Sequence, residues 1–476
     1  MKVEIRSTKA SFPYSAYVIL TQCKKDLGCA RYDDGAKRYQ NFAAFPYDYA
    51  PYHHFAFLIS NSSFKSDFHP QSKGRRPTGG RCTHFPKRGI PMKLQDIPSA
   101  LSAIADEGRF RRVEDLRMVT ASRGIRRDGK EYIVFNSNDY LGMTHESEVM
   151  AAARRAVIYG TGSGGARLTS GAVFELSELE KALAAFKHAE DAVIFNTGYM
   201  TNLGVLYALA DKGDVIFSDA LNHASIVDGC RISKARVVIY AHSDMEDLAR
   251  LLAETPCEGQ RFIVTDGVFS MDGDICPLPS LLSLKKKYGA CLIVDDAHGV
   301  GVIGDTGRGT AEYYHESGID IQVGTLSKSL GAEGGYAAAS KEITDYLRNV
   351  SRPFIFSTSI SAVTGASALA ALRLLEDNPS LYMGRLRFNT AYMKAKLSEA
   401  GIPVLPGDTS ILPIVIGDEK QTLAYAKACR EDGILLSAIR PPTVPAGTSR
   451  IRLTVTAAHT KDELDRAAEV MKRHWR

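Results

Sequence analysis

The sequence predicts an α/β fold in which a mostly parallel β-sheet lies between two layers of helices. Three observations predict this class. Between about residues 185 and 340, short β-branched and apolar runs alternate with stretches of helical spacing. The runs are apolar throughout, which is typical of parallel strands buried on both faces. Each run also ends in polar residues, and open α/β sheets bind their ligands at the carboxyl ends of the strands.

Six runs are predicted to be strands, and helical patterns lie between them. The connecting helices include "SDMEDLARLLAET" (243–255) and "LPSLLSLKKKYG" (278–289), in which apolar residues recur at helical spacing. A strand, a covering helix and a return to the next strand form the repeating unit of a parallel sheet. The predicted strands are "DAVIFNTG" (191–198), "DVIFSD" (214–219), "RVVIYAH" (236–242), "RFIVTDGVFS" (261–270), "CLIVDDAHG" (291–299) and "IQVGTLSK" (321–328).

The bulk composition argues against two classes of partner. A chain of 476 residues is long enough for two or three domains. Its net charge is only +5, with no long basic run, which argues against a nucleic-acid partner. No run of about 18 apolar residues occurs, so no membrane span is predicted. The eight cysteines are scattered without a CxxC pair, which favours a reducing compartment and predicts a cytoplasmic location.

An aromatic-rich first segment ends near residue 91. It holds 15 of the 40 Phe and Tyr residues of the chain and shows no sustained strand or helix periodicity. From Met92 the pattern is regular, and "MKLQDIPSALSAIADEGRFRRVEDL" (92–116) has helical spacing. Residues 1–91 are either an accessory or targeting extension or sequence upstream of a natural start at Met92, and the lack of a signal-peptide pattern favours the second. No metal is predicted, because the segment's Cys23, Cys29, His53 and His54 match no familiar metal-site spacing.

The glycine-rich stretch "GTGSGG" (160–165) raises the alternative of a dinucleotide-binding fingerprint. That fingerprint follows a strand and opens a helix. Here the preceding residues, "EVMAAARRAVIYG" (148–160), have an alanine-rich helical pattern. The required context is missing, so the nicotinamide-cofactor hypothesis is set aside.

Three residues at predicted strand ends combine into a recognisable chemistry. Asp295 emerges from an apolar strand, where a carboxylate is costly unless a cation or donors meet it. Taken alone, Asp295 could be a helix cap and His298 a core histidine. Lys328 changes this interpretation, because it is an isolated amine among small uncharged residues, a setting that lowers the pKa of an amine. A carboxylate for the pyridine nitrogen, an amine for a Schiff base and glycine-rich turns for a phosphate are what pyridoxal 5'-phosphate needs.

Seven motifs then follow one another over the last 385 residues. They are "NDYLG" (138–142), "GTGSGGARLTSG" (160–171), "SDALNHASIVDG" (218–229), "DGVFSMDGD" (266–274), "VDDAHGVGVIGDTGRG" (294–309), "TLSKSLG" (325–331) and "FSTS" (356–359). In this order they resemble the α-oxoamine synthases, fold-type I pyridoxal-phosphate enzymes that condense an amino acid with an acyl thioester. The resemblance implies a seven-stranded, mostly parallel sheet and a smaller α+β domain. It also implies an arm over residues 92–137, a large cofactor-binding domain over 138–375 and a C-terminal domain over 376–476.

The resemblance implies roles around the cofactor ring. Lys328 would carry the cofactor and later move the α-proton of the amino acid. Asp295 would pair with the pyridine nitrogen, and His298 would bond to the phenolic oxygen. His223 would stack over the ring, and Ser270 would lie beside it. Either His298 or His223 could assist acyl transfer as an acid, and the sequence does not distinguish them.

The resemblance also implies a phosphate site and a homodimer. The backbone of Gly198 and Tyr199 and the hydroxyl of Thr325 would hold the phosphate. Thr358, in the "FSTS" motif, would reach the phosphate of a neighbouring subunit. The active sites would then lie at the interface between two copies of the chain.

The C-terminal stretch "SAIRPPTVPAGTSRIRLTVTAAHT" (437–460) resembles the branch of the family that uses L-alanine and a pimeloyl thioester in biotin synthesis. Glycine-using relatives begin this stretch with Tyr-Pro, where this chain has Arg440 and two prolines. The implied partners are L-alanine and either pimeloyl-CoA or pimeloyl-acyl carrier protein. Arg452 would bind the carboxylate of alanine through its planar fork. Other implied substrate contacts are Thr443, Asn138, His223 and Arg111, with Arg109 and Arg112 as alternatives to Arg111.

Two alternatives stay open at this point. One is a different α-oxoamine synthase, such as a glycine C-acetyltransferase or a 5-aminolevulinate synthase. The other is a binding or regulatory protein that has kept the fold without catalysis. The presence of Lys328, Asp295, His298, His223 and Arg452 argues against the second.

Overall fold

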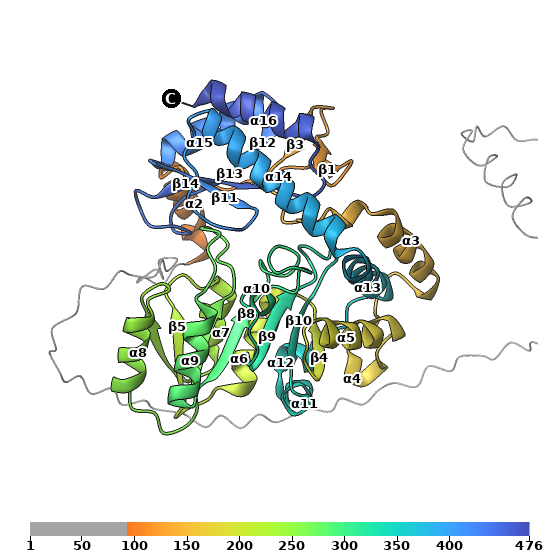
Figure 1. The fold of residues 1–476 in the computed structure, drawn as a ribbon, viewed down its shortest axis with the longest axis vertical. Helices are drawn as coiled ribbons and strands as arrows, with labels where there is room; N and C mark the ends of the chain where they lie inside the picture. The colour runs from red at the N-terminus through yellow and green to blue at the C-terminus, as the bar shows by residue number, and fades with distance from the viewer. Residues whose placement is uncertain (1–92, 476) are drawn as a thin grey trace, which may run out of the picture. The chain divides into compact units, whose positions relative to one another are not determined.

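A seven-stranded sheet forms the centre of the computed structural model, which describes residues 93–475 (Figure 1). Its strand order is β4-β10-β9-β8-β7-β5-β6, and β10 alone runs antiparallel to its neighbours. All six predicted strands are confirmed. The strands are β4 (Asp191–Phe195), β5 (Val215–Asp219), β6 (Arg236–Tyr240), β7 (Arg261–Asp266), β8 (Cys291–Asp295), β9 (Ile321–Thr325) and β10 (Gly335–Ala339). The predictions for residues 1–91, including Cys23, Cys29, His53 and His54, lie outside the described residues.

Helices cover both faces of this sheet, because neighbouring strand residues point to opposite faces. Phe195 packs in one cluster with Leu206 and Ile226, whereas Ile194 packs in another with Leu183. The first face is covered by α6 (Gly198–Leu209), α7 (Ala224–Ile232), α11 (Lys341–Val350) and α12 (Arg352–Ile355). The second is covered by α5 (Phe174–Phe186), α8 (Met245–Glu254), α9 (Leu278–Tyr288) and α13 (Ala362–Asp377).

The strand β10 begins with a glycine because α6 starts directly against it. A Cβ atom added at Gly335 would lie 2.6 Å from backbone atoms of Gly198, closer than side chains tolerate. The start of α6 can therefore approach the edge of the sheet. This close approach brings the first turn of α6 to the strand ends.

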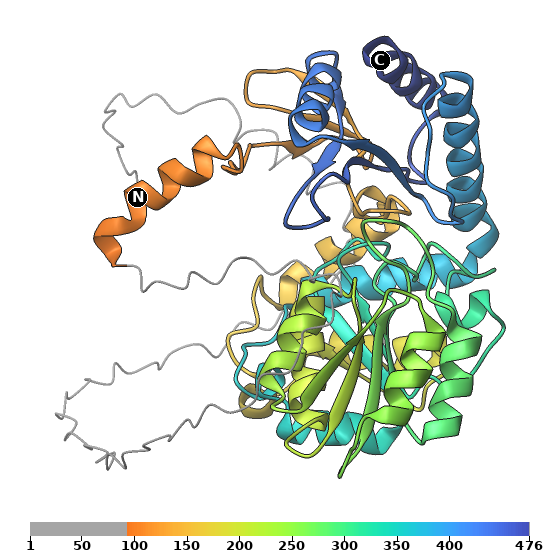
Figure 2. The ribbon, with the colours of Figure 1, turned by 90° about the vertical axis from the view of Figure 1, so that its left-hand side faces the viewer.

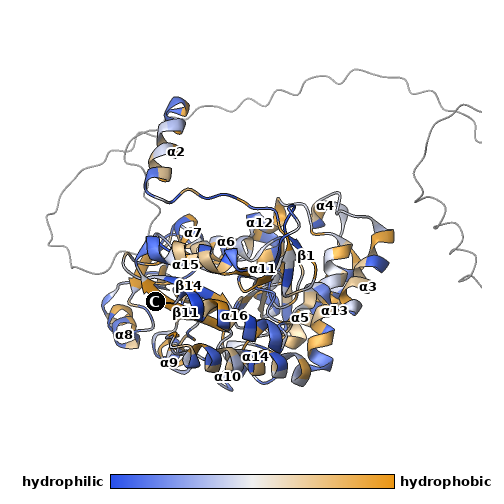
Figure 3. Cartoon of the chain, turned by 90° about the horizontal axis from the view of Figure 1, so that it is seen from above, coloured by the Kyte–Doolittle hydropathy of each residue, from blue (hydrophilic) through white to orange (hydrophobic). Residues whose placement is uncertain are grey.

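The C-terminal residues form a second layered unit. Its sheet has the order β11-β14-β13, all antiparallel, with α14, α15 and α16 packed around one apolar cluster. Figure 3 shows hydrophilic and hydrophobic residues mixed along α14 and α16, as expected of helices with one buried face. The elements are β11 (Ile411–Gly417), β13 (Ser437–Ile439), β14 (Ser449–Thr454), α14 (Pro379–Glu399), α15 (Glu419–Glu431) and α16 (Lys461–His474).

Early residues of the described chain pair with late ones. A four-stranded sheet of order β1-β2-β3-β12 joins residues 117–134 to the C-terminal part of the chain, and Figure 2 shows these segments side by side. The division into an arm and two domains at residues 137 and 375 stays a prediction. The remaining elements are α2 (Ile97–Asp106), β1 (Arg117–Met118), β2 (Arg123–Ile125), β3 (Glu131–Val134), α3 (Ser147–Ala156), α4 (Arg167–Ser170), α10 (Thr310–Tyr313) and β12 (Ile434–Leu435), with short 3-10 turns at Leu94–Asp96, Met143–His145 and Val157–Tyr159.

The helical spacing of residues 92–116 is only partly realised. Helix α2 ends at Asp106, and Gly108 follows with a φ of 67°. A left-handed glycine after a helix is a common C-terminal stop. Within residues 93–475, no helix combines the length and apolar character needed to cross a membrane.

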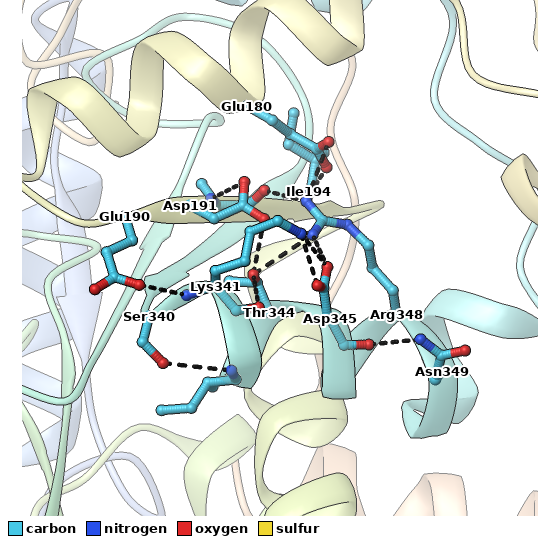
Figure 4. Close-up of polar contacts among 12 residues, drawn as sticks. Glu180, Glu190, Asp191, Ile194, Ser340, Lys341, Thr344, Asp345, Arg348 and Asn349 are labelled. Atoms are coloured by element: carbon cyan, nitrogen blue, oxygen red, sulfur yellow. Dashed lines mark hydrogen bonds and ion pairs between the residues drawn. The ribbon is translucent and has the colours of Figure 1, made fainter.

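A buried acid on α5 joins four segments of the large sheet region. The Glu180 carboxylate accepts hydrogen bonds from both Nη groups of Arg167, at 2.7 and 2.8 Å, and from the backbone N–H of Ile194, at 2.8 Å. Arg348 lies 3.5 Å from the same carboxylate and binds Asp191 at 2.6 Å (Figure 4). These bonds fasten the motif at residues 160–171 to the edge strand β4.

We expect Glu180→Ala to lower the free energy of unfolding by roughly 3–5 kcal/mol, because it leaves the Arg167 guanidinium buried without its partner. Chemical denaturation measures this change. The matched control is Glu178→Ala on the same helix, where the exposed carboxylate pairs with Lys181 and should matter little. Equal stability of the two variants would contradict the role assigned to Glu180.

Candidate active site

The carboxyl ends of β7, β8 and β9 meet the start of α6, and the predicted site residues gather there. Asp266 and Asp295 are the last residues of adjacent strands and pair directly in the sheet register. Lys328 lies three residues beyond the end of β9. This is the edge at which a parallel sheet is expected to bind its ligand.

Asp295 is a buried and firmly oriented carboxylate, with 5% of its surface exposed. Its Oδ2 accepts from Nδ2 of Asn202 at 2.6 Å, and its Oδ1 accepts from the backbone N–H of Ala297 at 3.0 Å. Asn202 in turn donates to Oγ of Ser225 at 2.9 Å. The donors therefore fix the direction in which the carboxylate faces the site.

Lys328 carries an amine of altered basicity. The side chain is partly exposed in the open site, but protein atoms crowd its amine, and this desolvation lowers the pKa of Lys328 to about 8. The carboxylates of Asp295 and Asp266 oppose the shift, and the Arg452 guanidinium adds to it. An amine of this pKa is partly neutral at physiological pH, as a nucleophile and proton acceptor must be.

Asp266 is a second buried carboxylate in the site, to which the sequence analysis assigns no role. Burial and the nearby charge of Asp295 raise the pKa of Asp266 well above its ordinary value. It accepts the backbone N–H of His223 at 2.7 Å. Asp266 therefore positions the start of α7 through the backbone of His223.

A chain of hydrogen bonds joins Arg452 to His298 through Tyr140. Nη2 of Arg452 donates to the hydroxyl of Tyr140 at 3.2 Å, and that hydroxyl lies 2.6 Å from Nδ1 of His298. Burial, followed by the charges of Lys328 and Arg452, lowers the pKa of His298 well below its usual value. The ring is therefore neutral. Because the Tyr140 oxygen already accepts from Arg452 and lies closer to His298 than to Asn138, we infer that its O–H donates to Nδ1 of His298, which leaves the ring proton on Nε2.

Arg452 is buried and held by acceptors from several parts of the chain. Its Nε donates to the carbonyl of Ser270, and its Nη1 donates to Oδ1 of Asn138 at 3.1 Å and to Oγ1 of Thr454 at 3.0 Å. No carboxylate is among the partners of this guanidinium in the described structure. Arg452 is therefore suited to bind an anionic substrate group beside Lys328.

His223 caps α7 and faces the site. Its Nδ1 accepts the backbone N–H of Ser225 at 3.2 Å, which leaves the ring proton on Nε2. The residue keeps an exposed surface, yet desolvation and the Lys328 charge lower the pKa of His223, while Asp295 opposes the shift. The ring of Tyr199 meets His223 edge-on, with centroids 6.4 Å apart.

The start of α6 and the end of β9 form an anion cradle. The N-cap of α6, Thr197, satisfies the N–H of Met200, which leaves the backbone donors of Gly198 and Tyr199 for a ligand. A Cβ atom at Gly198 would lie 3.3 Å from Cβ of Thr325, so the two segments are in close contact. The hydroxyls of Thr325 and Ser327 lie 2.8 Å apart at this point.

The remaining predicted residues lie farther out. Thr358 has an exposed side chain, and its carbonyl accepts from Asn196 at 2.7 Å. Arg111 and Thr443 line one hollow of about 980 Å³, together with Met271, Arg440 and Arg112. Ser270, Met271 and Thr443 also line a smaller hollow of about 170 Å³. The structure thus brings Ser270 and Thr443 to one hollow, and Arg111 and Thr443 to the other. Arg109 pairs with Glu107 nearby.

These residues fit pyridoxal phosphate. The oriented carboxylate of Asp295 suits a protonated pyridine nitrogen, and Lys328 supplies an amine of lowered pKa. The N-terminal turn of α6 and the Thr325 hydroxyl suit a phosphate. The sequence alone does not point to Asp266, Tyr140 or Asn202. The first two lie inside the motifs "DGVFSMDGD" and "NDYLG", whereas Asn202 lies within a helix whose sequence marks no such role.

The fold and this site define the class: the chain is a fold-type I pyridoxal-phosphate transferase. The aminotransferase class I and II family model matches residues 130–471. A structure of SPT with PLP is 32% identical, with a TM-score of 0.75 over 80% of this chain and 97% of that chain. An 8-amino-7-oxononanoate synthase structure from Francisella tularensis is 27% identical, with a TM-score of 0.61 over 72% of this chain and 97% of that chain.

Sequence relatives narrow the class. The 8-amino-7-oxononanoate synthase of Geobacter sulfurreducens is 46% identical over 385 residues, which are 80% of this chain and 97% of that protein. The synthase of Lysinibacillus sphaericus is 42% identical over 375 residues, 78% of this chain and 96% of that protein. The chain therefore belongs to the aminotransferase class I and II family and, within it, to the 8-amino-7-oxononanoate synthase group of the α-oxoamine synthases. The resemblance inferred from the motifs is confirmed.

We expect Asp295→Asn to lower the pKa of Lys328 below about 8, because the Asp295 carboxylate is the strongest group that favours the charged amine. The measurement is the pH dependence of Lys328 acylation in cofactor-free protein, followed by peptide mass spectrometry. Glu254→Gln, which removes an exposed carboxylate paired with Arg250, is the control and should change nothing. An inflection at the ordinary lysine value of 10.5 in the unaltered protein would show that the amine is not desolvated.

Proposed function

We propose that the protein condenses L-alanine with a pimeloyl thioester to give 8-amino-7-oxononanoate, carbon dioxide and a free thiol, a step of biotin biosynthesis. The α-carbon of alanine bonds to the acyl carbon, the carbon–sulfur bond breaks, and the alanine carboxyl group leaves as carbon dioxide. The observation that carries the proposal is the 46% identity of this chain to the 8-amino-7-oxononanoate synthase of Geobacter sulfurreducens, over 97% of that protein's length. The thioester is carried either by coenzyme A or by an acyl carrier protein.

The described residues account for cofactor binding. Lys328 would hold pyridoxal phosphate covalently, Asp295 would pair with its pyridine nitrogen, and the start of α6 with Thr325 would bind its phosphate. When bound, the cofactor supplies an electron sink for charge that develops at the α-carbon of the amino acid. His223 and His298, both neutral, would border the ring without adding a competing positive charge.

Arg452 would bind the carboxylate of alanine. The guanidinium is buried and already oriented by Ser270, Asn138 and Tyr140, so the site loses little side-chain freedom when alanine binds. The amino acid would then lie between Arg452 and Lys328. Nζ of Lys328, in its neutral form, would then accept the α-proton of alanine.

The proton on Nε2 of either histidine is available to the acyl oxygen. His298 receives its hydrogen bond from Tyr140 on Nδ1, and His223 receives one from the backbone on the same atom. Each ring therefore presents its Nε2 proton on the side away from those partners. The acyl chain and its carrier would lie in the two hollows that meet at Met271 and Thr443, with Arg111 and Arg440 at the outer end.

The proposal includes a cytoplasmic location. Free thiols at Cys230, Cys276 and Cys429 are buried and unpaired by disulfides, which suits a reducing compartment.

The proposal also includes a homodimer. Large side chains stay exposed at Ile158 and Tyr159 and at Phe356, with 78%, 70% and 69% of their surfaces accessible. The backbone N–H of Ser359 donates to the carbonyl of Gly165 at 2.9 Å, so the segments bearing them adjoin. Clustered apolar exposure of this kind is typical of a protein–protein interface. A second copy covering it would bring Thr358 to the neighbouring phosphate site.

Incubation of the protein with pyridoxal phosphate, L-alanine and each pimeloyl thioester should release carbon dioxide and free thiol in equal amounts. Glycine with acetyl-CoA, and glycine with succinyl-CoA, are the competing pairs.

We expect Lys328→Ala to abolish turnover and Arg452→Ala to reduce kcat/KM for alanine by roughly 100-fold or more, as expected for loss of a charged contact. Condensation of glycine with acetyl-CoA alone would overturn the alanine assignment.

We expect Ile158→Asp to shift the protein from dimer to monomer, because it places a charge in the covered apolar face. Sedimentation velocity measures the change. Leu381→Asp, at an exposed position on α14 with 43% of its surface accessible, is the control and should stay dimeric. An unaltered protein that sediments as a monomer would overturn the dimer.

A further inference from the structure

His242, just beyond β6, lies between two carboxylates that the reaction described above does not use. Its Nδ1 lies 3.0 Å from Oδ1 of Asp219, and its Nε2 lies 2.9 Å from Oδ2 of Asp274. Ionised carboxylates only accept hydrogen bonds, so a ring that satisfies both must carry a proton on each nitrogen. Burial by itself would lower the pKa of His242, but the bonds to Asp219 and Asp274 outweigh it and raise the pKa to about 10.

One of the two carboxylates belongs to the rigid sheet. Asp219 is the last residue of β5 and is almost fully buried. It also accepts the backbone N–H groups of Leu221 at 2.8 Å and Ser243 at 2.9 Å. Asp219 therefore fixes His242 to the carboxyl edge of the sheet.

The other carboxylate belongs to a tight turn over residues 269–274. The N–H of Phe269 donates to the carbonyl of Asp274 at 2.9 Å, and the N–H of Gly273 donates to the carbonyl of Phe269 at 2.8 Å. The Phe269 ring also meets His242 edge-on, with centroids 4.4 Å apart. The imidazolium thus holds both ends of this turn, which we call the 269–274 turn.

The opposite side of the 269–274 turn contacts the C-terminal sheet. The carbonyl of Ser270 accepts Nε of Arg452, and Asp272 forms an ion pair with Arg450. The carbonyl of Gly273 accepts Oγ1 of Thr409 at 2.8 Å. The turn therefore supplies, through the carbonyl of Ser270, one of the contacts that orient the Arg452 guanidinium.

We propose that His242 is a positioning residue: clamped as an imidazolium between Asp219 and Asp274, it holds the 269–274 turn and thereby aims Arg452 at the carboxylate of the amino-acid substrate. The role of Arg452 in this statement rests on the proposed function. The groups that face His242 are Asp219 from β5, and Asp274 and Phe269 from the turn. His242 itself touches neither the cofactor residues nor Arg452, and acts only through the turn.

The test compares His242→Gln and Asp274→Asn with the unaltered full-length protein loaded with pyridoxal phosphate. L-alanine is titrated alone, and the absorbance of the bound cofactor reports its dissociation constant. We expect this constant to rise roughly ten- to hundred-fold, as for other displacements of a substrate-orienting group. The dissociation constant of the cofactor should change far less than that of alanine, because Lys328, Asp295 and α6 lie outside the turn and only Ser270 of the turn would lie beside the cofactor ring. The control is His474→Gln, which removes a histidine paired with Asp432 at 3.0 Å and of similar exposure.

Two further readouts separate positioning from general damage. The double variant should weaken alanine binding no more than either single variant, because both changes break the same clamp. Arginine-specific modification of cofactor-free protein, mapped by peptide mass spectrometry, should label Arg452 faster in both variants than in the unaltered chain. This second readout needs no substrate.

Equal labelling of Arg452 in variants and unaltered protein would overturn the proposal, as would equal loss of cofactor and alanine affinity. An unaltered, cofactor-loaded protein that does not respond to alanine would contradict the proposed function instead. In that case faster labelling of Arg452 in the variants would still support the clamp.

Discussion

The site depends on one arrangement of charge: the amine of Lys328 lies buried beside two carboxylates at the edge of the central sheet. Asp266 and Asp295 end adjacent parallel strands, so the sheet register itself brings two carboxyl groups together. Such a pair is costly in a buried place unless donors and a cation meet it. Here Asn202 donates a hydrogen bond to Asp295, and the backbone N–H of His223 donates one to Asp266. The amine of Lys328 supplies the nearby cation. Desolvation lowers the pKa of Lys328 to about 8, and the two carboxyl groups oppose that shift.

A second constraint is that the site is shared between the two sheets. Lys328 and Asp295 come from the central sheet, whereas Arg452 comes from β14 of the C-terminal sheet. Tyr140 and the 269–274 turn join them through hydrogen bonds. Because Arg452 takes its orientation from groups on other elements, small shifts between the sheets change where it points. We infer that substrate affinity in this fold is sensitive to residues that never touch substrate.

Local sequence predicted those parts of the fold whose pattern is strong. The six apolar runs each form a strand, because a strand of a parallel sheet is covered by helices on both faces and buries every residue of a continuous apolar run. The seventh strand, β10, is Gly-Tyr-Ala-Ala-Ala, which has no strand pattern and pairs only because β4 and β9 flank it. The helical spacing after Met92 predicted α2 but not its end at Asp106, where Gly108 turns the chain. Tertiary contacts and turn chemistry decided these two cases.

The sequence by itself determined the sheet class, the family and the identity of Lys328, Asp295, His298, His223 and Arg452 as the residues of interest, because each lies in an ordered motif or at a strand end. The tertiary structure decided which groups tune them. Asn202 contacts Asp295, which lies 93 positions away in the chain, and Tyr140 contacts His298, 158 positions away. Asp266 contacts the backbone of His223, 43 positions away. His242 likewise gains its charge from Asp219 and Asp274, 23 and 32 positions away. Hydrogen bonds and desolvation act over a few ångströms, so only the folded chain reveals which partners share that distance.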